Sequence, residues 1–250
     1  MNLYDDARLY DLQYERYRDD VPHYLRLAAQ EDGPVLELGS GTGRLTAALA
    51  GAGFRVTGVE LAAGMLEVAR ERLGDTALLL QGDMRRLDGL DLEPGSFSLV
   101  IAPFNALMHL HGLSDQDAAL AGAFRLLRPG GLLALDLYRP DPGPLGVLRV
   151  EPEWSHVAGE GGQLFLVQEH DELNQVITSR YLIDEQTTGG MFRRRTVTLT
   201  QRYYHRFEIE RALLAAGFGQ FRLSGSFDGS RYTPASTHMV ITCRRPAAAR

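Results

Sequence analysis

A short apolar run that passes directly into a glycine-rich turn is the feature that most constrains this chain. The run is Val35–Leu38, and the sequence continues Gly39-Ser40-Gly41-Thr42-Gly43 before a helical pattern begins. Glycine permits a tight turn and lets the backbone approach a ligand closely. The first N–H groups of the following helix remain free to bind that ligand. The pattern therefore predicts a ligand site at the carboxyl end of a strand.

Apolar strands and helices alternate around this turn. Between residue 33 and about residue 138 the alternation is typical of βαβ units built around a parallel sheet. One more helix follows near residues 209–216, and two final strands are expected near residues 218–223 and 238–243. The expected strands of the parallel part cover residues 35–38, 55–59, 77–81, 97–102 and 132–137. An α/β fold is the prediction.

Two segments stand apart from this alternation. Residues 1–30 are expected to form an N-terminal helical segment, with Tyr10, Tyr14 and Tyr17 on one helical face. After the proline-rich stretch 140–144 the apolar period becomes two, so residues 141–203 are expected to be an antiparallel β insertion. The core is then residues 31–140 and 204–250. An insertion of this size at one point suggests a lid over a site.

Charge and cysteine content exclude several classes of protein. The formal net charge is −6, and every basic side chain is an arginine because the sequence contains no lysine. Schiff-base lysines and P-loop lysines are therefore excluded. An acidic chain disfavours nucleic acid as a partner, and the basic run 193–195 is interpreted as a solvated strand end. A single cysteine, Cys243, excludes an internal disulfide. With no apolar run long enough for a membrane span and no leader pattern, a cytoplasmic protein is expected.

The residues around the turn indicate the kind of ligand. A dinucleotide fingerprint, G-x-G-x-x-G, requires glycine at position 44, where this chain has Arg44. Glu37, inside the strand, suits an ammonium group better than a pyrophosphate. Glu60 ends the next strand and can accept hydrogen bonds from ribose hydroxyls. Asp83 and Met84 follow the third strand and can receive an adenine ring. Since successive parallel strands end at one edge, these side chains are expected to converge there.

Five ordered segments resemble the motifs of class I S-adenosylmethionine-dependent methyltransferases. They are ELGSGTGRLT, VTGVELAAGMLEVAR, LQGDMRRLD, FSLVIAPFNALMHL and LRPGGLLALDLY. The resemblance covers about residues 30–140 and implies a Rossmann-like doubly wound sheet of seven strands, the last antiparallel. It implies S-adenosyl-L-methionine as cofactor and S-adenosyl-L-homocysteine as product. The cofactor-binding residues it implies are Glu37, Gly39, Ser40, Gly41, Thr42, Gly43, Glu60, Leu61, Met65, Gly82, Asp83, Met84 and Pro103.

The methyl acceptor is expected to be a small polar metabolite, methylated at nitrogen or oxygen. The insertion and the tyrosine-rich N-terminus resemble the branch that contains sugar-amine N,N-dimethyltransferases. In that branch a Tyr-Asp pair closes over the cofactor, which points to Tyr10 and Asp11. His109, after the fourth strand, is the candidate general base, and no metal is expected. Two alternatives stay open at this point: an NAD(P)-dependent oxidoreductase, and a non-catalytic sensor of S-adenosylmethionine.

Overall fold

The computed structural model describes residues 2–14, 16–139, 148–149, 162–186 and 190–247. The chain divides into two compact units. The core unit comprises Tyr17–Pro140 and Tyr204–Arg250, and the insertion unit comprises Met1–Arg16 and Asp141–Tyr203. The N-terminal segment that was predicted over residues 1–30 is thus shared by both units. The predicted boundary at residues 140–144 and the single tryptophan, Trp154, lie outside the described residues.

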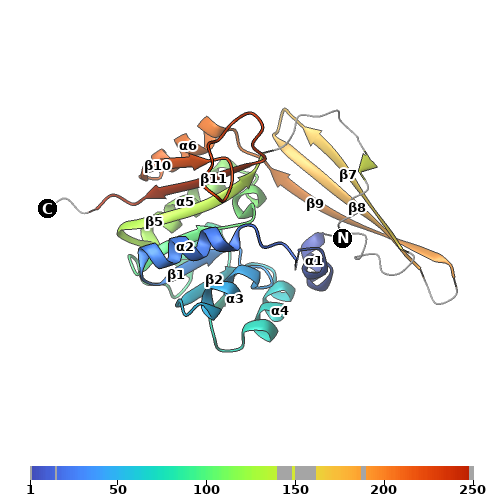
Figure 1. The fold of residues 1–250 in the computed structure, drawn as a ribbon, viewed down its shortest axis with the longest axis horizontal. Coiled ribbons are helices and arrows are strands. Elements are labelled where there is room, and N and C mark those ends of the chain that lie inside the picture. Colours follow the sequence, from blue (N-terminus) through green and yellow to red (C-terminus); the bar gives the residue numbers. More distant parts are fainter. Residues whose placement is uncertain (1, 15, 140–147, 150–161, 187–189, 248–250) are drawn as a thin grey trace. The chain divides into compact units, whose positions relative to one another are not determined.

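A seven-stranded sheet forms the centre of the core unit (Figure 1), in the order β10-β11-β5-β4-β1-β2-β3. Strands β1 to β5 are mutually parallel, whereas β11 runs antiparallel to both β5 and β10. The strands are β1 (Val35–Leu38), β2 (Val56–Glu60), β3 (Leu78–Gln81), β4 (Phe97–Ala102), β5 (Leu127–Tyr138), β10 (Gly219–Ser224) and β11 (His238–Arg244). The predicted Rossmann-like doubly wound sheet is confirmed.

The direction of winding reverses between β1 and β4. From β1 the chain proceeds outward to β2 and β3, and it then returns to place β4 on the other side of β1. In doubly wound sheets, ligands bind outside the carboxyl ends of the strands at this reversal. The turn after β1 and the loop after β4 therefore flank the expected crevice.

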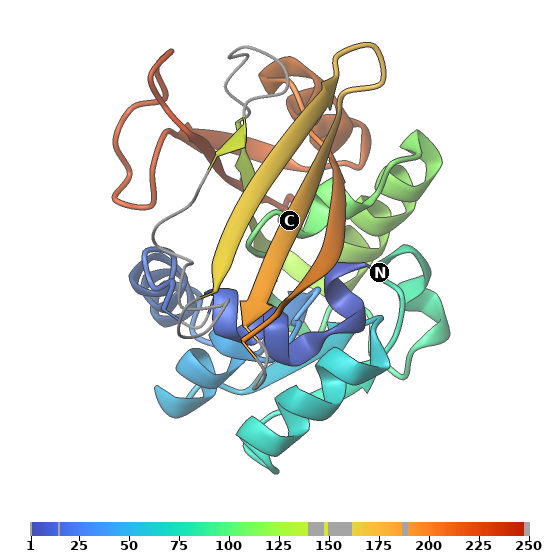
Figure 2. The ribbon, with the colours of Figure 1, turned by 90° about the vertical axis from the view of Figure 1, so that its right-hand side faces the viewer.

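Helices cover both faces of this sheet, with α2 and α5 on opposite sides (Figures 1 and 2). Tyr24 and Ala28 of α2 and Leu45 and Leu49 of α3 are buried against Val35 and its neighbours in the sheet. This apolar packing fixes the strand ends that carry the site. The helices of the core unit are α2 (Val21–Glu31), α3 (Arg44–Gly51), α4 (Ala63–Leu73), α5 (Leu113–Leu126) and α6 (Arg206–Ala215), with the 3₁₀ helices η2 (Met84–Gly89) and η3 (Ala106–His109).

The insertion unit is a four-stranded antiparallel sheet with its own apolar core. Its long strands form twisted hairpins (Figure 2), and their alternating residues pack with Leu3 and Leu9 of the N-terminal segment. Its elements are η1 (Leu3–Asp5), α1 (Ala7–Tyr14), β6 (Leu148–Arg149), β7 (Gln163–Asp171), β8 (Val176–Gln186) and β9 (Phe192–Arg202). Arg195 binds Asp6 at 2.6 Å, which joins β9 to the start of α1. The antiparallel sheet matches the prediction, and its role as a lid stays a prediction.

Two helical patterns were interpreted wrongly. The tyrosine stripe does not continue to Tyr17, because α1 ends at Tyr14 and Tyr17 belongs to the core unit. The spacing of Leu61, Met65 and Val68 in the sequence predicts a second buried helical face, but the Leu61 side chain is 60% exposed. The buried side of α4 is formed instead by Met65, Leu66 and Ala69. In both cases the helix limits differ from those that the apolar spacing alone suggested.

Candidate active site

The turn after β1 requires glycine at three alternate positions. Gly39, Gly41 and Gly43 have φ angles of 73°, 58° and 78°, in the left-handed region that L side chains rarely adopt. A Cβ on Gly43 would lie 2.8 Å from Leu73 of α4, and one on Gly39 would lie 3.2 Å from Ala106 of η3. The turn is therefore held close to the segments that follow β2 and β4.

Glu37 is a buried carboxyl group at the end of β1. It is 2% exposed, and its Oε2 accepts a hydrogen bond of 2.6 Å from the Thr46 hydroxyl of α3. Burial raises the pKa of Glu37 to about 8, although the bond from Thr46 and the Arg44 guanidinium both act to lower that pKa. A buried carboxyl group poised in this way gains a favourable interaction when a ligand brings a positive charge.

Glu60, at the end of β2, supports the glycine turn directly. One carboxylate oxygen accepts the Gly41 N–H at 2.9 Å, and the other accepts the Ala62 N–H at 2.8 Å. Burial raises the pKa of Glu60, and these backbone bonds oppose the rise. Each oxygen has a second lone pair, so the carboxylate can also accept from ribose hydroxyls. The role as turn support was not visible in the sequence.

Ser40 and Thr42 lie between the glycines and differ in their bonding. The Ser40 hydroxyl is buried and has no hydrogen-bond partner among the described residues, and such a group calls for a ligand or a water. By contrast, the Thr42 carbonyl and hydroxyl oxygens accept bonds from Arg72 of α4, at 2.9 and 3.3 Å. Met65 is buried beneath the turn, with its methyl group 3.6 Å from a Cβ built on Gly41.

The segment after β3 contributes Met84 but holds Asp83 in a local ion pair. The Met84 methyl group lies 3.4 Å from a Cβ built on Gly39, so Met84 reaches the glycine turn. The Asp83 carboxylate accepts from the Arg85 backbone N–H and side chain at 2.9 and 2.8 Å, and the Arg85 guanidinium lowers the pKa of Asp83. A Cβ built on Gly82 would lie 2.8 Å from the Leu90 side chain, so Leu90 packs closely against Gly82.

The loop after β4 has an unusual backbone, and its supports were missed by sequence reasoning. Pro103 is buried, and the two residues that follow it, Phe104 and Asn105, have φ angles of 52° and 64°. Such conformations are uncommon for residues other than glycine, least so for Asn, and two in succession beside a ligand crevice are typical of a functional loop. The Asp136 carboxylate of β5 accepts the Phe104 N–H at 2.9 Å and the Tyr24 hydroxyl at 2.6 Å. Burial raises the pKa of Asp136 to about 6.

The two proposed catalytic residues lie in different units. His109 ends η3 in the core unit, the helix whose first residue, Ala106, faces Gly39. Burial and the neighbouring His111 lower the pKa of His109 to about 4, so its imidazole is neutral at pH 7. Tyr10 lies on α1 in the insertion unit, where its ring packs against Tyr14 at 4.8 Å between centroids.

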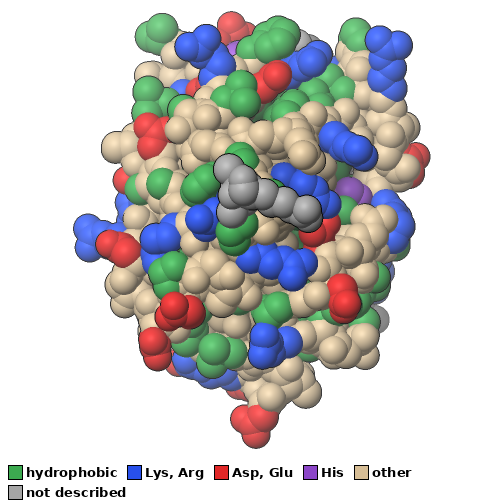
Figure 3. Space-filling model, turned by 90° about the vertical axis from the view of Figure 1, so that its left-hand side faces the viewer, with side chains coloured by type: hydrophobic (Ala, Val, Ile, Leu, Met, Phe, Trp, Pro, Cys, Tyr) green, Lys and Arg blue, Asp and Glu red, His purple; other side chains and the backbone are tan. Residues whose placement is uncertain are grey.

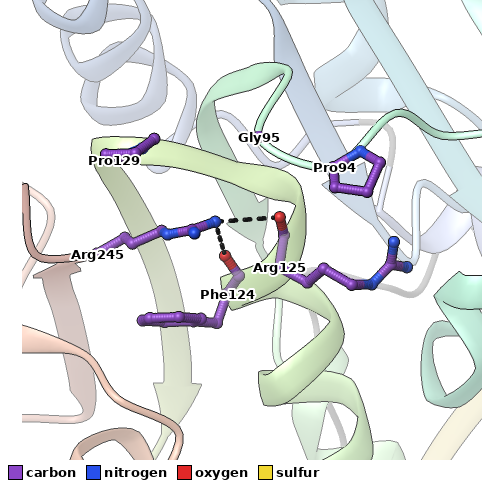
Figure 4. Close-up of a pocket in the computed structure, with 6 residues that line it drawn as sticks. All are labelled: Pro94, Gly95, Phe124, Arg125, Pro129 and Arg245. Carbon is purple, nitrogen blue, oxygen red and sulfur yellow. Dashed lines mark hydrogen bonds between the residues drawn. The ribbon is translucent and has the colours of Figure 1, made fainter. Parts of the chain in front are cut away.

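The opposite edge of the sheet carries a hollow of about 540 Å³. Figure 4 shows the Arg245 guanidinium turned toward the carbonyl oxygens of Phe124 and Arg125, which it binds at 3.1 and 3.2 Å. Arg245 also binds the Leu127 carbonyl at 2.7 Å, and thereby satisfies the end of α5. The arginine at this edge therefore supports the fold. The hollow is lined by Pro94, Gly95, Phe124, Arg125, Pro129 and Arg245.

Comparison with known proteins identifies the domain. Residues 35–131 match the family model described as a methyltransferase domain. A putative methyltransferase of Bacillus subtilis (strain 168), YqeM, is 26% identical over 245 residues, covering 96% of this chain and 95% of the relative. The solved CcbJ methyltransferase from Streptomyces caelestis is 26% identical with a TM-score of 0.80, covering 98% of this chain and 99% of that one. CalS10 from Micromonospora echinaspora, an amino pentose methyltransferase solved with S-adenosylmethionine bound, is 25% identical with a TM-score of 0.73, covering 98% and 97%.

Residues 35–131 thus carry a methyltransferase domain, and the S-adenosylmethionine-dependent methyltransferase that the motifs predicted is confirmed. It is an enzyme of this class rather than an oxidoreductase or a sensor. The residues present fit the cofactor: the glycine turn leaves space that a Cβ would fill, the Ser40 hydroxyl is buried without a partner, and Glu37 is a buried acid suited to an ammonium group. S-Adenosylmethionine supplies a methyl group already activated on a sulfonium.

The described residues also bear on metal binding and on membrane spanning. They contain no group of three or more histidine, cysteine, aspartate or glutamate side chains placed to hold a metal ion. No helix among them combines the length and apolarity that a membrane span needs.

Proposed function

We propose that this enzyme methylates an amino group of a small polar metabolite, such as an amino sugar. The observation that carries the proposal is the length of the match to CalS10, an amino pentose methyltransferase. The match extends over 98% of the chain and so includes the insertion unit as well as the cofactor domain. The cofactor domain alone is shared by enzymes with many acceptors, so an insertion in common carries more information about the acceptor.

The chemistry of His109 favours nitrogen over oxygen as the methylated atom. A hydroxyl group usually needs a base to remove its proton, whereas an amine can bind in its neutral form. His109 has a pKa lowered to about 4 by burial and by His111, which makes it a weak base at pH 7. We therefore propose that His109 lies beside the acceptor and that the reaction does not require His109 to remove a proton. Tyr10 is proposed to close over the bound cofactor.

Cofactor binding is assigned to the residues around the glycine turn. In this proposal Glu37 binds the amino-acid ammonium group, and Gly39, Ser40, Gly41, Thr42 and Gly43 surround the same part of the ligand. Glu60 accepts from the ribose hydroxyls while it supports Gly41. Asp83 and Met84 receive the adenine ring, and the remaining predicted residues, Leu61, Met65, Gly82 and Pro103, complete the cofactor site. Asp83 reaches the adenine only if its ion pair with Arg85 rearranges.

Nucleic acid is not expected as an acceptor, and we propose a cytoplasmic enzyme. The arginine run of β9 is matched by acids of its own unit: Arg194 binds Asp184 and Arg195 binds Glu185, both at 2.7 Å. Acidic and basic side chains are also interspersed on the face drawn in Figure 3. Binding a phosphate backbone requires a dense basic face, so paired and mixed charges support a small acceptor. Cell fractionation would test the location.

Matched pairs of acceptors test the reaction. The purified chain is incubated with S-adenosylmethionine and amino sugars, each paired with the hydroxyl sugar of the same stereochemistry, and products are identified by mass spectrometry. We expect one or two methyl groups on amines and none on the paired hydroxyl sugars. Methylation of the hydroxyl sugars, or of nucleic acid but not of amines, would overturn the proposal. Glu37→Gln serves as a variant with weakened cofactor binding.

A further inference from the structure

Arg44 occupies the position at which a dinucleotide fingerprint would have its third glycine, and it has an unusually complete set of contacts. Its two terminal nitrogens bind the two Asp20 oxygens at 2.8 and 2.6 Å, and one of them also binds the Tyr17 carbonyl at 3.2 Å. The guanidinium lies 5.3 Å from the ring centroids of both Tyr17 and Phe104. The centroids of these two rings lie 5.1 Å apart, so one guanidinium joins the segment before α2 to the loop after β4.

The position of Arg44 is energetically unfavourable for a positive charge. Arg44 is the first residue of α3, and a positive charge at a helix N-terminus is opposed by the helix dipole. Asp20 compensates for the charge and is completely buried. It is also the N-cap residue of α2, yet its side chain makes no capping bond because both oxygens face Arg44. Asp20 thus forms the ion pair with Arg44 in place of the capping hydrogen bond that an N-cap aspartate usually makes.

Phe104 connects this ion pair to the loop beside the crevice. Its backbone is left-handed, and its N–H is bound by Asp136. The next residue, Asn105, is also left-handed, and its side-chain oxygen accepts the Tyr138 N–H of β5. Two hydrogen bonds to β5, each between a backbone N–H and a side-chain oxygen, thus fix one side of the loop. The ring of Phe104, against Arg44, fixes the other.

We propose that Arg44 is a positioning residue for the loop Pro103–Asn105. It holds Phe104 and Asn105 in their left-handed form, so that the acceptor meets the cofactor in line. The proposal rests on the proposed function, because it treats the carboxyl end of β4 as the acceptor side. It assigns Arg44 no contact with acceptor or cofactor. Its effect on transfer passes through the side chain of Phe104.

Arg44→Lys is the sharpest test, because lysine keeps the charge but loses the planar fork and the stacking surface. Arg244→Lys is a matched control. Arg244 binds both oxygens of Glu31, at 2.9 and 2.6 Å, and one carbonyl, that of Gly130 at 2.8 Å, at the opposite edge of the sheet. Phe104→Leu is a second test, since it removes the ring and leaves the ion pair intact.

Two measurements are made on each variant. Hydrogen exchange of the protein alone, followed on peptides that cover residues 103–108, reports on the loop without any methyl transfer. We expect faster exchange in Arg44→Lys and Phe104→Leu and unchanged exchange in Arg244→Lys. Steady-state assays should show kcat reduced by up to about 100-fold in the two loop variants, as a small misplacement of reactants can produce. Their Kd for S-adenosylhomocysteine should change far less.

Each contrary result has a distinct meaning. Unchanged exchange at residues 103–108 in Arg44→Lys would overturn the inference, whether or not an acceptor is known. A loss of S-adenosylhomocysteine affinity as large as the loss of kcat would also overturn it, since Arg44 would then act on the glycine turn. An equal loss of kcat in Arg244→Lys would also overturn the inference, because the loss in Arg44→Lys would then reflect a general loss of stability. A wild-type enzyme that methylates no amine would refute the proposed function, while the exchange result would still decide the inference.

Discussion

The carboxyl ends of the parallel strands form one edge of the seven-stranded sheet, the carboxyl edge, and their amino ends form the amino edge. The two edges use the same kinds of side chain for different purposes. Each edge has an arginine that binds a buried acid of α2 through both oxygens: Arg44 with Asp20 at the carboxyl edge, and Arg244 with Glu31 at the amino edge. Asp20 is 0% exposed and Arg44 12%, whereas the Arg244 side chain is 35% exposed. Water can therefore replace a lost partner at the amino edge but much less at the carboxyl edge.

The carboxyl edge also concentrates the buried acids. Burial raises the pKa values of Glu37, Glu60 and Asp136, and all three lie at or near the ends of parallel strands on this edge. At the amino edge, Arg245 is instead bound by backbone carbonyls at the end of α5. The difference teaches that this fold buries ionisable carboxyl groups, at an energetic cost, where ligands are expected to bind. Elsewhere its charged side chains are paired or bound by backbone carbonyls.

The largest difference between the edges should appear when each acid is removed. Asp20→Ala leaves Arg44 buried without its ion-pair partner, so we expect a loss of about 3–5 kcal/mol in the free energy of unfolding. Glu31→Ala leaves the partly exposed Arg244 accessible to water, and should cost about 1 kcal/mol. Urea unfolding of the full chain measures both. Equal losses would show that the two ion pairs are equivalent.

The glycines of the two edges offer a second contrast. Gly43 and Gly53 both have left-handed backbones, with φ angles of 78° and 91°. A Cβ on Gly43 would meet Leu73 at 2.8 Å, but one on Gly53 would meet nothing within 4 Å. We expect Gly43→Ala to cost about 3 kcal/mol, from backbone strain and overpacking together, and Gly53→Ala about 1 kcal/mol from strain alone. Thermal unfolding would reveal whether the site turn is the more sensitive.

The raised pKa of Glu37 predicts a dependence of stability on pH. Between the usual pKa of a glutamate and about 8, the folded protein holds a proton on Glu37 that the unfolded chain has released. Stability therefore falls as pH rises through this window. Asp136 and His109 change protonation mainly below pH 6.5, so between pH 6.5 and 8 we expect Glu37 to contribute a decline of about 2 kcal/mol. Glu60, whose pKa burial also raises, adds to the decline in the same direction. Glu37→Gln should make the slope clearly smaller, and an unaltered slope in this variant would contradict the assignment.

The smallest expected effect concerns Ser40. Its hydroxyl has no hydrogen-bond partner among the described residues, so Ser40→Ala should leave the free energy of unfolding nearly unchanged. If the hydroxyl binds the cofactor, the affinity for S-adenosylhomocysteine should fall by about 0.5–1.5 kcal/mol, the usual value of one hydrogen bond. Calorimetric titration of the variant would detect this. A large loss of stability with no loss of affinity would make Ser40 a structural residue.

The positions of the strands along the chain and the glycine turn could be predicted from the sequence because both depend on local patterns. Val35–Leu38 is apolar at every position but Glu37, and glycine is needed where φ is positive. The supports of the site could not be predicted in this way. Asp136 lies on β5, and it meets Tyr24 and Phe104 only after the sheet has assembled. No local pattern distinguishes it from a solvated acid.

Contacts that form only in the assembled fold were also not visible in local patterns. Arg44 was notable in the sequence only as an absent glycine, but in the fold it joins Asp20, Tyr17 and Phe104. Asp83 is predicted to face an adenine ring, and in the structure the nearby Arg85 binds its carboxylate. An arginine two residues away is visible in the sequence, so this ion pair was a signal that sequence reasoning could have used.

The left-handed backbone at Phe104 and Asn105 has a consequence for engineering. Because Asp136 and Asn105 anchor this loop to β5, its shape is encoded partly outside the loop itself. Transplanting residues 103–105 into a homologous scaffold should therefore fail unless an acceptor equivalent to Asp136 travels with them. Libraries that aim to broaden substrate range would do better to keep these three residues fixed and to randomise the neighbouring positions.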